Sequence, residues 1–309
     1  MKRSVLIIFI IILLFAGIAF MLYPTLSDYW NVLHQSSATV DYANTVNAFE
    51  DGMFDEMWDR AVEYNKQLYE KSCGKYVADP IPYDSVLNVT DNGMMAYIDI
   101  PKINVHLPLY HTVEEGVLQS NAGHVETSSL PVGGENTHCV ISGHTGLPSA
   151  RLFTDLERIV VGDTFTINTL GVVLTYEVDQ IVVVNPWESD ELRIFSGKDY
   201  CTLLTCTPYG VNSHRLLVRG HRIETTEEVA AAVLNVELVY RKTAEPFFIA
   251  VGVAVLIIII AIILVVIRLI TNRKRKKNEK HTQSACVDNK PCVEEASDAQ
   301  ASNVGKESE

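Results

Sequence analysis

The sequence predicts a mainly β protein, in which a closed or nearly closed β-barrel is flanked by two apolar helices. Three observations support this fold class. Residues 91–225 contain seven or eight short runs rich in Val, Ile, Thr and Tyr, with turn residues between them. A helical pattern precedes these runs, and an uncharged apolar segment lies toward each end of the chain.

The two apolar segments predict transmembrane helices. Residues 5–23 and 247–267 contain 19 and 21 residues without a charge, and about 20 apolar residues cross a bilayer as a helix. Lys2 and Arg3 precede the first segment, and basic residues follow the second. Because basic flanks favour the cytosol, we expect a two-pass protein of the cell membrane with both termini cytosolic. A cleaved signal peptide is the alternative for the first segment.

Composition divides the chain into seven segments. A helical repeat of apolar residues covers 25–72, with a predicted break at 50–52, and a short helix is expected at 150–156. The expected segments are an anchor (1–23), an extracellular helical region (24–75), a loop (76–90), the barrel (91–225), a juxtamembrane linker (226–246), a second transmembrane helix (247–270), and a cytosolic tail that is basic, then polar and disordered (271–309).

The charge of the section expected outside the cell excludes some functions. Residues 24–246 carry 14 Lys and Arg against 31 Asp and Glu, a net charge of −17. Nucleic-acid binding depends on many basic side chains, so nucleic acid is not an expected partner. The acidic residues are scattered without the spacing of a ligand set, so neither a metal nor a cofactor is expected.

Six cysteines give little support for a framework of disulfide bonds. Cys201 and Cys206 are five residues apart, so on one strand they point to opposite faces and cannot pair locally. A bond between Cys73 and Cys139 is the pairing least excluded. We expect most of the thiols to be buried as small apolar side chains.

Cys206 calls for a different interpretation because of its surroundings. The stretch YCTLLTCTPYGVNSHRLLVRGHR, residues 200–222, predicts two strands joined by a turn, with Cys206 ending the first and Arg215 opening the second. An antiparallel hairpin would bring this thiol and guanidinium together, as expected for a nucleophile. His144 lies on a Gly-flanked turn after the predicted strand THCVIS, where it could transfer protons.

These motifs resemble those of sortases, the membrane-anchored cysteine transpeptidases of Gram-positive bacteria. The resemblance is carried by TLLTCTPYG and HRLLVRGHR, and by VISGHTG 62 residues before the cysteine, and it extends over residues 97–223. It implies an eight-stranded sortase-type barrel with short helices. It also implies that Cys206 is the nucleophile, that His144 is the general acid and base, and that Arg215 stabilises the oxyanion.

Two further features resemble the class C branch, which polymerises pilins. They are the second apolar segment and an Asp-Pro pair before the barrel, where this branch carries a lid loop with an Asp-Pro-aromatic motif. Asp79 and Pro80 match, whereas Ile81 occupies the aromatic position. We expect Tyr83 to replace the missing ring over the thiol, and Asp79 to pair with Arg215 in a closed state. The alternative is that Asp79-Pro80 only stiffens a loop.

The resemblance implies the chemistry. The enzyme would cleave an LPxTG-like sorting signal between Thr and Gly, form a thioacyl-enzyme, and transfer the acyl group to a pilin lysine, so that secreted pilins and the membrane are its partners. Three alternatives remain open at this stage. They are a cell-wall-anchoring sortase that uses a peptidoglycan-precursor amine, a cysteine protease, and a membrane-anchored scaffold without enzymatic activity.

Overall fold

The structure, a computed structural model, describes residues 2–231 together with 252, 267–268, 271–272 and 274–275. The predicted linker, second transmembrane helix and tail therefore lie largely outside the described residues. The chain divides into two units, one comprising Ile8–Phe247 and the other Met1–Ile7 with Phe248–Glu309. The barrel and the helices that contact it belong to the first.

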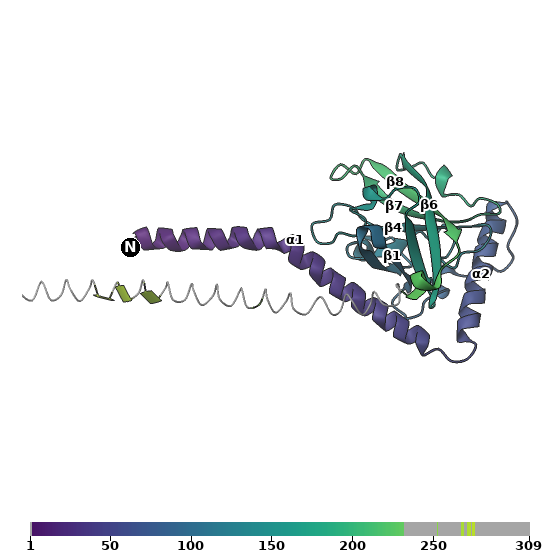
Figure 1. Cartoon of the computed structure of the whole chain (residues 1–309), viewed down its shortest axis with the longest axis horizontal. Coiled ribbons are helices and arrows are strands. Elements are labelled where there is room, and N and C mark those ends of the chain that lie inside the picture. The colour runs from purple at the N-terminus through teal and green to yellow at the C-terminus, as the bar shows by residue number, and fades with distance from the viewer. Residues whose placement is uncertain (1, 232–251, 253–266, 269–270, 273, 276–309) are drawn as a thin grey trace, which may run out of the picture. The chain divides into compact units, whose positions relative to one another are not determined.

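Eight strands form a closed barrel in the order β1-β2-β3-β4-β7-β8-β6-β5 (Figure 1). The pairs β2–β3 and β4–β7 are parallel, and the other neighbours are antiparallel. The predicted eight-stranded barrel is therefore confirmed. The strands are β1 (Met94–Ile100), β2 (Val105–Tyr110), β3 (Ala122–His124), β4 (Thr137–Ser142), β5 (Thr164–Thr169), β6 (Val172–Val184), β7 (Asp199–Thr207) and β8 (His214–Ile223).

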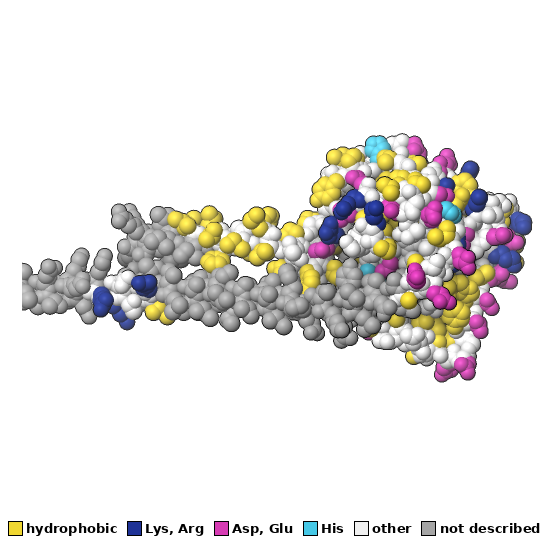
Figure 2. Space-filling model, viewed as in Figure 1, with side chains coloured by type: hydrophobic (Ala, Val, Ile, Leu, Met, Phe, Trp, Pro, Cys, Tyr) yellow, Lys and Arg dark blue, Asp and Glu magenta, His cyan; other side chains and the backbone are white. Residues whose placement is uncertain are grey.

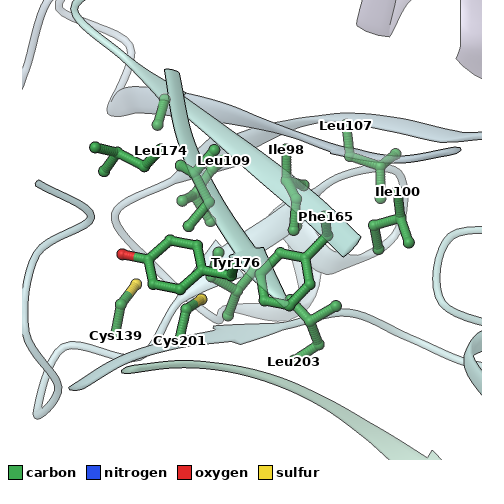
Figure 3. Packing of buried hydrophobic residues seen from close by; sticks show 14 of the residues in the cluster. Ile98, Ile100, Leu107, Leu109, Cys139, Phe165, Leu174, Tyr176, Cys201 and Leu203 are labelled. Carbon is green, nitrogen blue, oxygen red and sulfur yellow. The ribbon is translucent and has the colours of Figure 1, made fainter. Parts of the chain in front are cut away.

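Side chains from the strands fill the interior of the barrel. Figure 3 shows the rings of Phe165 and Tyr176 together at its centre, where their centroids lie 5.5 Å apart in a stacked arrangement. Aliphatic residues such as Ile98 and Leu203 surround the rings and are fully buried. This packing follows from the alternation of the strands, which turns every second side chain inward.

Two of the short runs rich in Val, Ile, Thr and Tyr, VVLTYEV at 172–178 and QIVVV at 180–184, form the single strand β6 in the structure. The pairing of β6 with β8 shifts between Val178 and Gln180, so Asp179 is an extra residue in a bulge that bends the strand without ending it. The Asp179 carboxylate accepts a hydrogen bond of 2.9 Å from Arg219 Nε. Asp179, the polar residue between the two runs, is thus one side of an ion pair with Arg219.

The prediction of a short helix at 150–156 is wrong. This segment forms turns followed by the 3-10 helix η3 (Leu156–Arg158). Leu152 has a φ of 40°, which a right-handed helix excludes. Nearby groups contact the N-terminal helix instead, since Asn31 Nδ2 donates to the Ser149 carbonyl oxygen at 2.8 Å. The other short helices are η1 (Tyr83–Ser85), η2 (Pro101–Ile103), α3 (Glu115–Leu118) and η4 (Asp190–Leu192).

Helix α1 (Lys2–Asn47) joins the predicted anchor to the helical region without a break. Within the part of the chain that the structure describes, its stretch Ile12–Asn47 is the one helix long and apolar enough to cross a membrane. Figure 2 shows apolar side chains exposed along it. Pro24 lies inside α1, where its missing N–H favours a bend, and Figure 1 shows the helix bending.

The C-terminal half of α1 is attached to the barrel through Tyr42. This residue is fully buried, and its ring meets that of Tyr97 edge-on with centroids 6.2 Å apart. The Tyr42 hydroxyl donates to the Met95 carbonyl oxygen at 2.8 Å and accepts from the Leu170 N–H at 2.9 Å. One side chain thus satisfies two backbone groups of the barrel.

Helix α2 (Met53–Ser72) follows the predicted break at 50–52, where Gly52 adopts a left-handed conformation. It packs on the barrel through Ala61, which is fully buried. The Asn65 amide, also buried, makes two hydrogen bonds with the backbone of Leu130: Nδ2 donates to the carbonyl oxygen at 3.0 Å, and Oδ1 accepts from the N–H at 2.7 Å. Polar side chains therefore fix both helices to the barrel.

We predict that Tyr42→Phe lowers the free energy of unfolding by about 1–3 kcal/mol, because it leaves the buried Leu170 N–H and Met95 carbonyl without their partner. Urea unfolding of the full chain in detergent measures this change. Tyr76→Phe is the matched control, since Tyr76 is 90% exposed. Equal stability of the two variants would contradict the attachment described for α1.

Candidate functional site

Neighbouring strands bring two of the predicted catalytic residues to one rim of the barrel. β4 and β7 run parallel, with Ser142 opposite Leu204. The Gly143 N–H donates to the Leu204 carbonyl oxygen at 3.1 Å, which extends the pairing beyond β4. Continuing this pairing by one more residue places His144 beside Cys206.

Arg215 reaches the same rim from β8. β7 and β8 are antiparallel, and Cys206 pairs directly with Arg215, so the two side chains lie on the same face. The guanidinium Nη1 donates to the carbonyl oxygens of His214 at 3.1 Å and Asn212 at 3.4 Å. The hairpin predicted from the sequence is therefore present, with the thiol and the guanidinium at its mouth.

Close packing holds the turn that carries His144. A side chain at Gly143 would clash, because its Cβ would lie 2.7 Å from the ring of Phe153. The His144 carbonyl oxygen accepts from the Phe153 N–H at 3.0 Å, and Thr205 Oγ1 donates to the Gly143 carbonyl oxygen at 2.7 Å. Gly146 adopts a φ of 77°, which glycine tolerates best. These contacts fix the backbone of the turn that carries the imidazole.

The three side chains remain open to solvent. Cys206 and Arg215 are half-buried, and the His144 side chain is 26% exposed. Beside the thiol, Thr207 Oγ1 donates to Glu157 Oε1 at 2.7 Å. A peptide can therefore approach a nucleophile, a proton carrier and a positively charged hydrogen-bond donor from one side, which is the set that acyl transfer requires.

The structure adds Glu115, which the sequence analysis did not identify. Its Oε2 lies 3.3 Å from His144 Nε2, and Gln119 Nε2 donates to its Oε1 at 2.6 Å. Glu115 belongs to the short helix α3, between β2 and β3. No local motif marks this residue, because the contact joins positions 29 residues apart and depends on the barrel.

The segment predicted to form a lid contacts helix α2. Asp79 and Pro80 are exposed, and the Ile81 N–H donates to Gln67 Oε1 on α2 at 3.1 Å. Arg215 donates to backbone carbonyls, so the expected ion pair with Asp79 is not formed in this structure.

Tyr83 does not replace the missing ring over Cys206. Its hydroxyl lies 2.7 Å from both the His111 carbonyl oxygen and His124 Nδ1, and its ring stacks on that of His124. The reason is that a buried phenol needs hydrogen-bond partners, which it finds at β3. Burial raises the pKa of Tyr83 well above its usual value, so the hydroxyl stays protonated.

The structure does not contain the Cys73–Cys139 bond, which the sequence analysis gave as the pairing least excluded. Cys73 is exposed at the end of α2, whereas Cys139 is fully buried beside Cys201, and these thiols are free in the structure. The expectation that Cys201 and Cys206 face opposite sides holds, since Cys201 is fully buried and Cys206 lies at the rim. Among the residues described, no cluster of three or more His, Cys, Asp or Glu could hold a metal ion.

A cavity of about 210 Å³ lies away from the rim, between α1 and the region around β2. It is lined by charged and polar residues that include Asp28, Gln35, Lys102 and Arg151. His144, Cys206 and Arg215 do not line it. The candidate site is therefore an open rim and not this cavity.

Comparison with known proteins agrees with the eight-stranded barrel. The model of the sortase domain matches residues 98–223. The chain is 28% identical to sortase D of Bacillus subtilis over 129 residues, which are 41% of this chain and 62% of that protein, just under two thirds of its length.

Among solved structures, sortase C1 of Streptococcus agalactiae is 48% identical, with a TM-score of 0.58, and the match covers 62% of this chain and 100% of that one. Sortase C of Clostridium perfringens, solved with the C-terminal cell wall sorting motif, is 42% identical, with a TM-score of 0.55 and coverage of 61% and 99%. The chain therefore belongs to the sortase family of cysteine transpeptidases.

Proposed function

We propose that this protein is a class C sortase that joins secreted pilins through a lysine side chain. The observation that carries the proposal is the meeting of His144, Cys206 and Arg215 at one rim of the barrel. The similar structures are class C enzymes, and one of them was solved with a sorting motif. The substrate would be an LPxTG-like signal, cleaved between Thr and Gly.

The first half of the reaction forms a thioester. The Cys206 thiolate attacks the carbonyl carbon of the threonine, and the electron pair of the carbonyl moves to its oxygen. Arg215 would donate hydrogen bonds to this oxyanion, whose charge is greatest in the transition state. When the C–N bond breaks, His144 gives its proton to the departing glycine amine.

The second half transfers the acyl group. A lysine amine of a second pilin attacks the thioester, His144 accepts the proton of the amine, and Cys206 leaves as a thiolate. A thioester remains reactive toward amines, so much of the free energy of the broken peptide bond is retained for the new bond. Exclusion of water from the site would reduce hydrolysis.

The placement outside the cell follows from the two apolar segments and their basic flanks. With both termini in the cytosol, the barrel faces the side on which secreted pilins emerge. α1 supports this arrangement, because its apolar N-terminal part continues directly into the part that contacts the barrel.

The function is tested by incubating the full chain in detergent with a pilin that carries an LPxTG-like signal. We expect a ladder of SDS-resistant pilin oligomers, and mass spectrometry should find a lysine joined to the threonine of the signal. Cys206→Ala should abolish the ladder, whereas Cys73→Ala, a change at an exposed thiol far along the sequence, should not. Transfer to a peptidoglycan-precursor amine without a ladder would replace the proposal with wall anchoring, and hydrolysis alone would indicate a protease.

Arg215→Ala should slow formation of the thioester by about 100- to 1000-fold, the usual effect of losing one oxyanion donor. The rate is measured by quenching the reaction with acid at successive times and determining the fraction of acylated enzyme by intact-protein mass spectrometry. Arg158→Ala is the control, because the Arg158 side chain is 68% exposed and lines the separate cavity near α1. A change of less than tenfold would remove Arg215 from the mechanism.

Glu115→Gln should have a much smaller effect. The Glu115 side chain is 68% exposed, and an exposed ion pair contributes at most about 1 kcal/mol, which is roughly a fivefold change in rate. We therefore expect turnover to fall by no more than about fivefold, with Glu114→Gln as the neighbouring control. A loss comparable to that of Arg215→Ala would make Glu115 an essential partner of His144.

A further inference from the structure

A pair of buried thiols lies inside the barrel, away from the site described above. Cys139 on β4 and Cys201 on β7 are direct partners in the parallel pairing, so their side chains leave the sheet on the same face. Both are fully buried, and Figure 3 shows the two sulfur atoms next to each other below the ring of Tyr176.

The geometry of this pair suits a disulfide bond. Neighbouring strands lie about 4.8 Å apart, and the Cα atoms of a disulfide are usually separated by about 4.4–6.8 Å. The two sulfur atoms are close enough to hydrogen-bond to each other. The spacing of paired strands therefore falls within the range that a disulfide bond requires.

The two thiols differ in their chemistry. Burial raises the pKa of Cys201 well above its usual value, and the neighbouring Cys139 adds to this shift. Burial acts in the same direction on Cys139, but hydrogen bonds from Cys201 and His124 outweigh it and lower its pKa to about 6. Thiol–disulfide exchange begins with a thiolate, and either cysteine can supply one while the chain folds, before both are buried.

We propose that Cys139 and Cys201 form a disulfide bond in the mature protein, and that this bond locks the two strands that carry the catalytic His144 and Cys206. The proposal rests on the proposed placement of the barrel outside the cell, where disulfides persist. Cys139 lies five residues before His144, and Cys201 lies five residues before Cys206. One covalent bond would thus prevent β4 and β7 from shifting along each other, and would fix the position of the imidazole relative to the nucleophile.

The oxidant is a small disulfide or the disulfide of an extracytoplasmic thiol oxidoreductase. The thiolate of one cysteine attacks one sulfur of this disulfide, forms a mixed disulfide, and releases the first thiol. The other cysteine then attacks the sulfur of the first cysteine and releases the second thiol. The protons of the two cysteines pass to the two released thiols, so one disulfide is reduced for each one formed. Because both sulfurs are inaccessible in the folded barrel, the exchange takes place during folding.

Peptide mapping of the full chain tests the proposal. The protein is purified in detergent without reductant, denatured in iodoacetamide and digested. We expect the peptides containing Cys139 and Cys201 to be linked and two hydrogens lighter than their sum, while Cys73 and Cys206 are alkylated. If both Cys139 and Cys201 are alkylated, even after refolding with oxidised glutathione, the proposal is overturned. Bound zinc that protects both thiols until a chelator is added would also overturn it.

Thermal unfolding gives a second measurement. Reductant should lower the Tm of the wild type by roughly 5–15 °C and leave that of the double variant Cys139→Ala/Cys201→Ala unchanged. An equal response of the two proteins would contradict the bond. Cys206→Ala should keep the linked peptides, so the bond and the transpeptidase activity can fail independently.

Discussion

The candidate site depends on the register of three adjacent strands. β4 and β7 must pair in parallel with Cys139 opposite Cys201, and β7 and β8 must pair with Cys206 opposite Arg215. A slip of one residue would turn every side chain of a strand to the other face. Cys206 would then point into the barrel, and the thiol would be unavailable to a substrate.

Buried side chains on both faces of the sheet maintain this register. His138 Nε2 lies 2.7 Å from Thr202 Oγ1, a contact that joins β4 to β7 on the face opposite Cys139 and Cys201. Thr205 Oγ1 donates to the Gly143 carbonyl oxygen at the rim end of the same pair. Because buried polar groups need partners with good geometry, a shifted register would leave these groups unsatisfied. These buried contacts thus determine which side chains reach the rim.

The features predicted correctly from the sequence are those that depend on residues close together in the chain. Alternation of apolar residues identified the strands, and the Pro-Tyr-Gly turn identified the hairpin of Cys206 and Arg215. The interpretation failed where distant segments decide the outcome. Tyr83 is placed by hydrogen-bond partners on another part of the barrel, and Asp179 lies in a bulge that only the pairing with β8 reveals. Glu115 was missed for the same reason.

The attachment of α1 has a consequence for the substrates that the enzyme can reach. Gln35, Thr39 and Tyr42 lie along one side of the helix, and each is buried against the barrel. The apolar stretch before them belongs to the same helix, so no flexible linker separates it from the barrel. With this stretch in the membrane, as proposed, a continuous helix connects the membrane to the barrel. Its length sets how far the barrel lies from the membrane, because a helix extends only 1.5 Å per residue. Pilins would then have to be presented close to the membrane, because the site cannot extend away from it on a free chain.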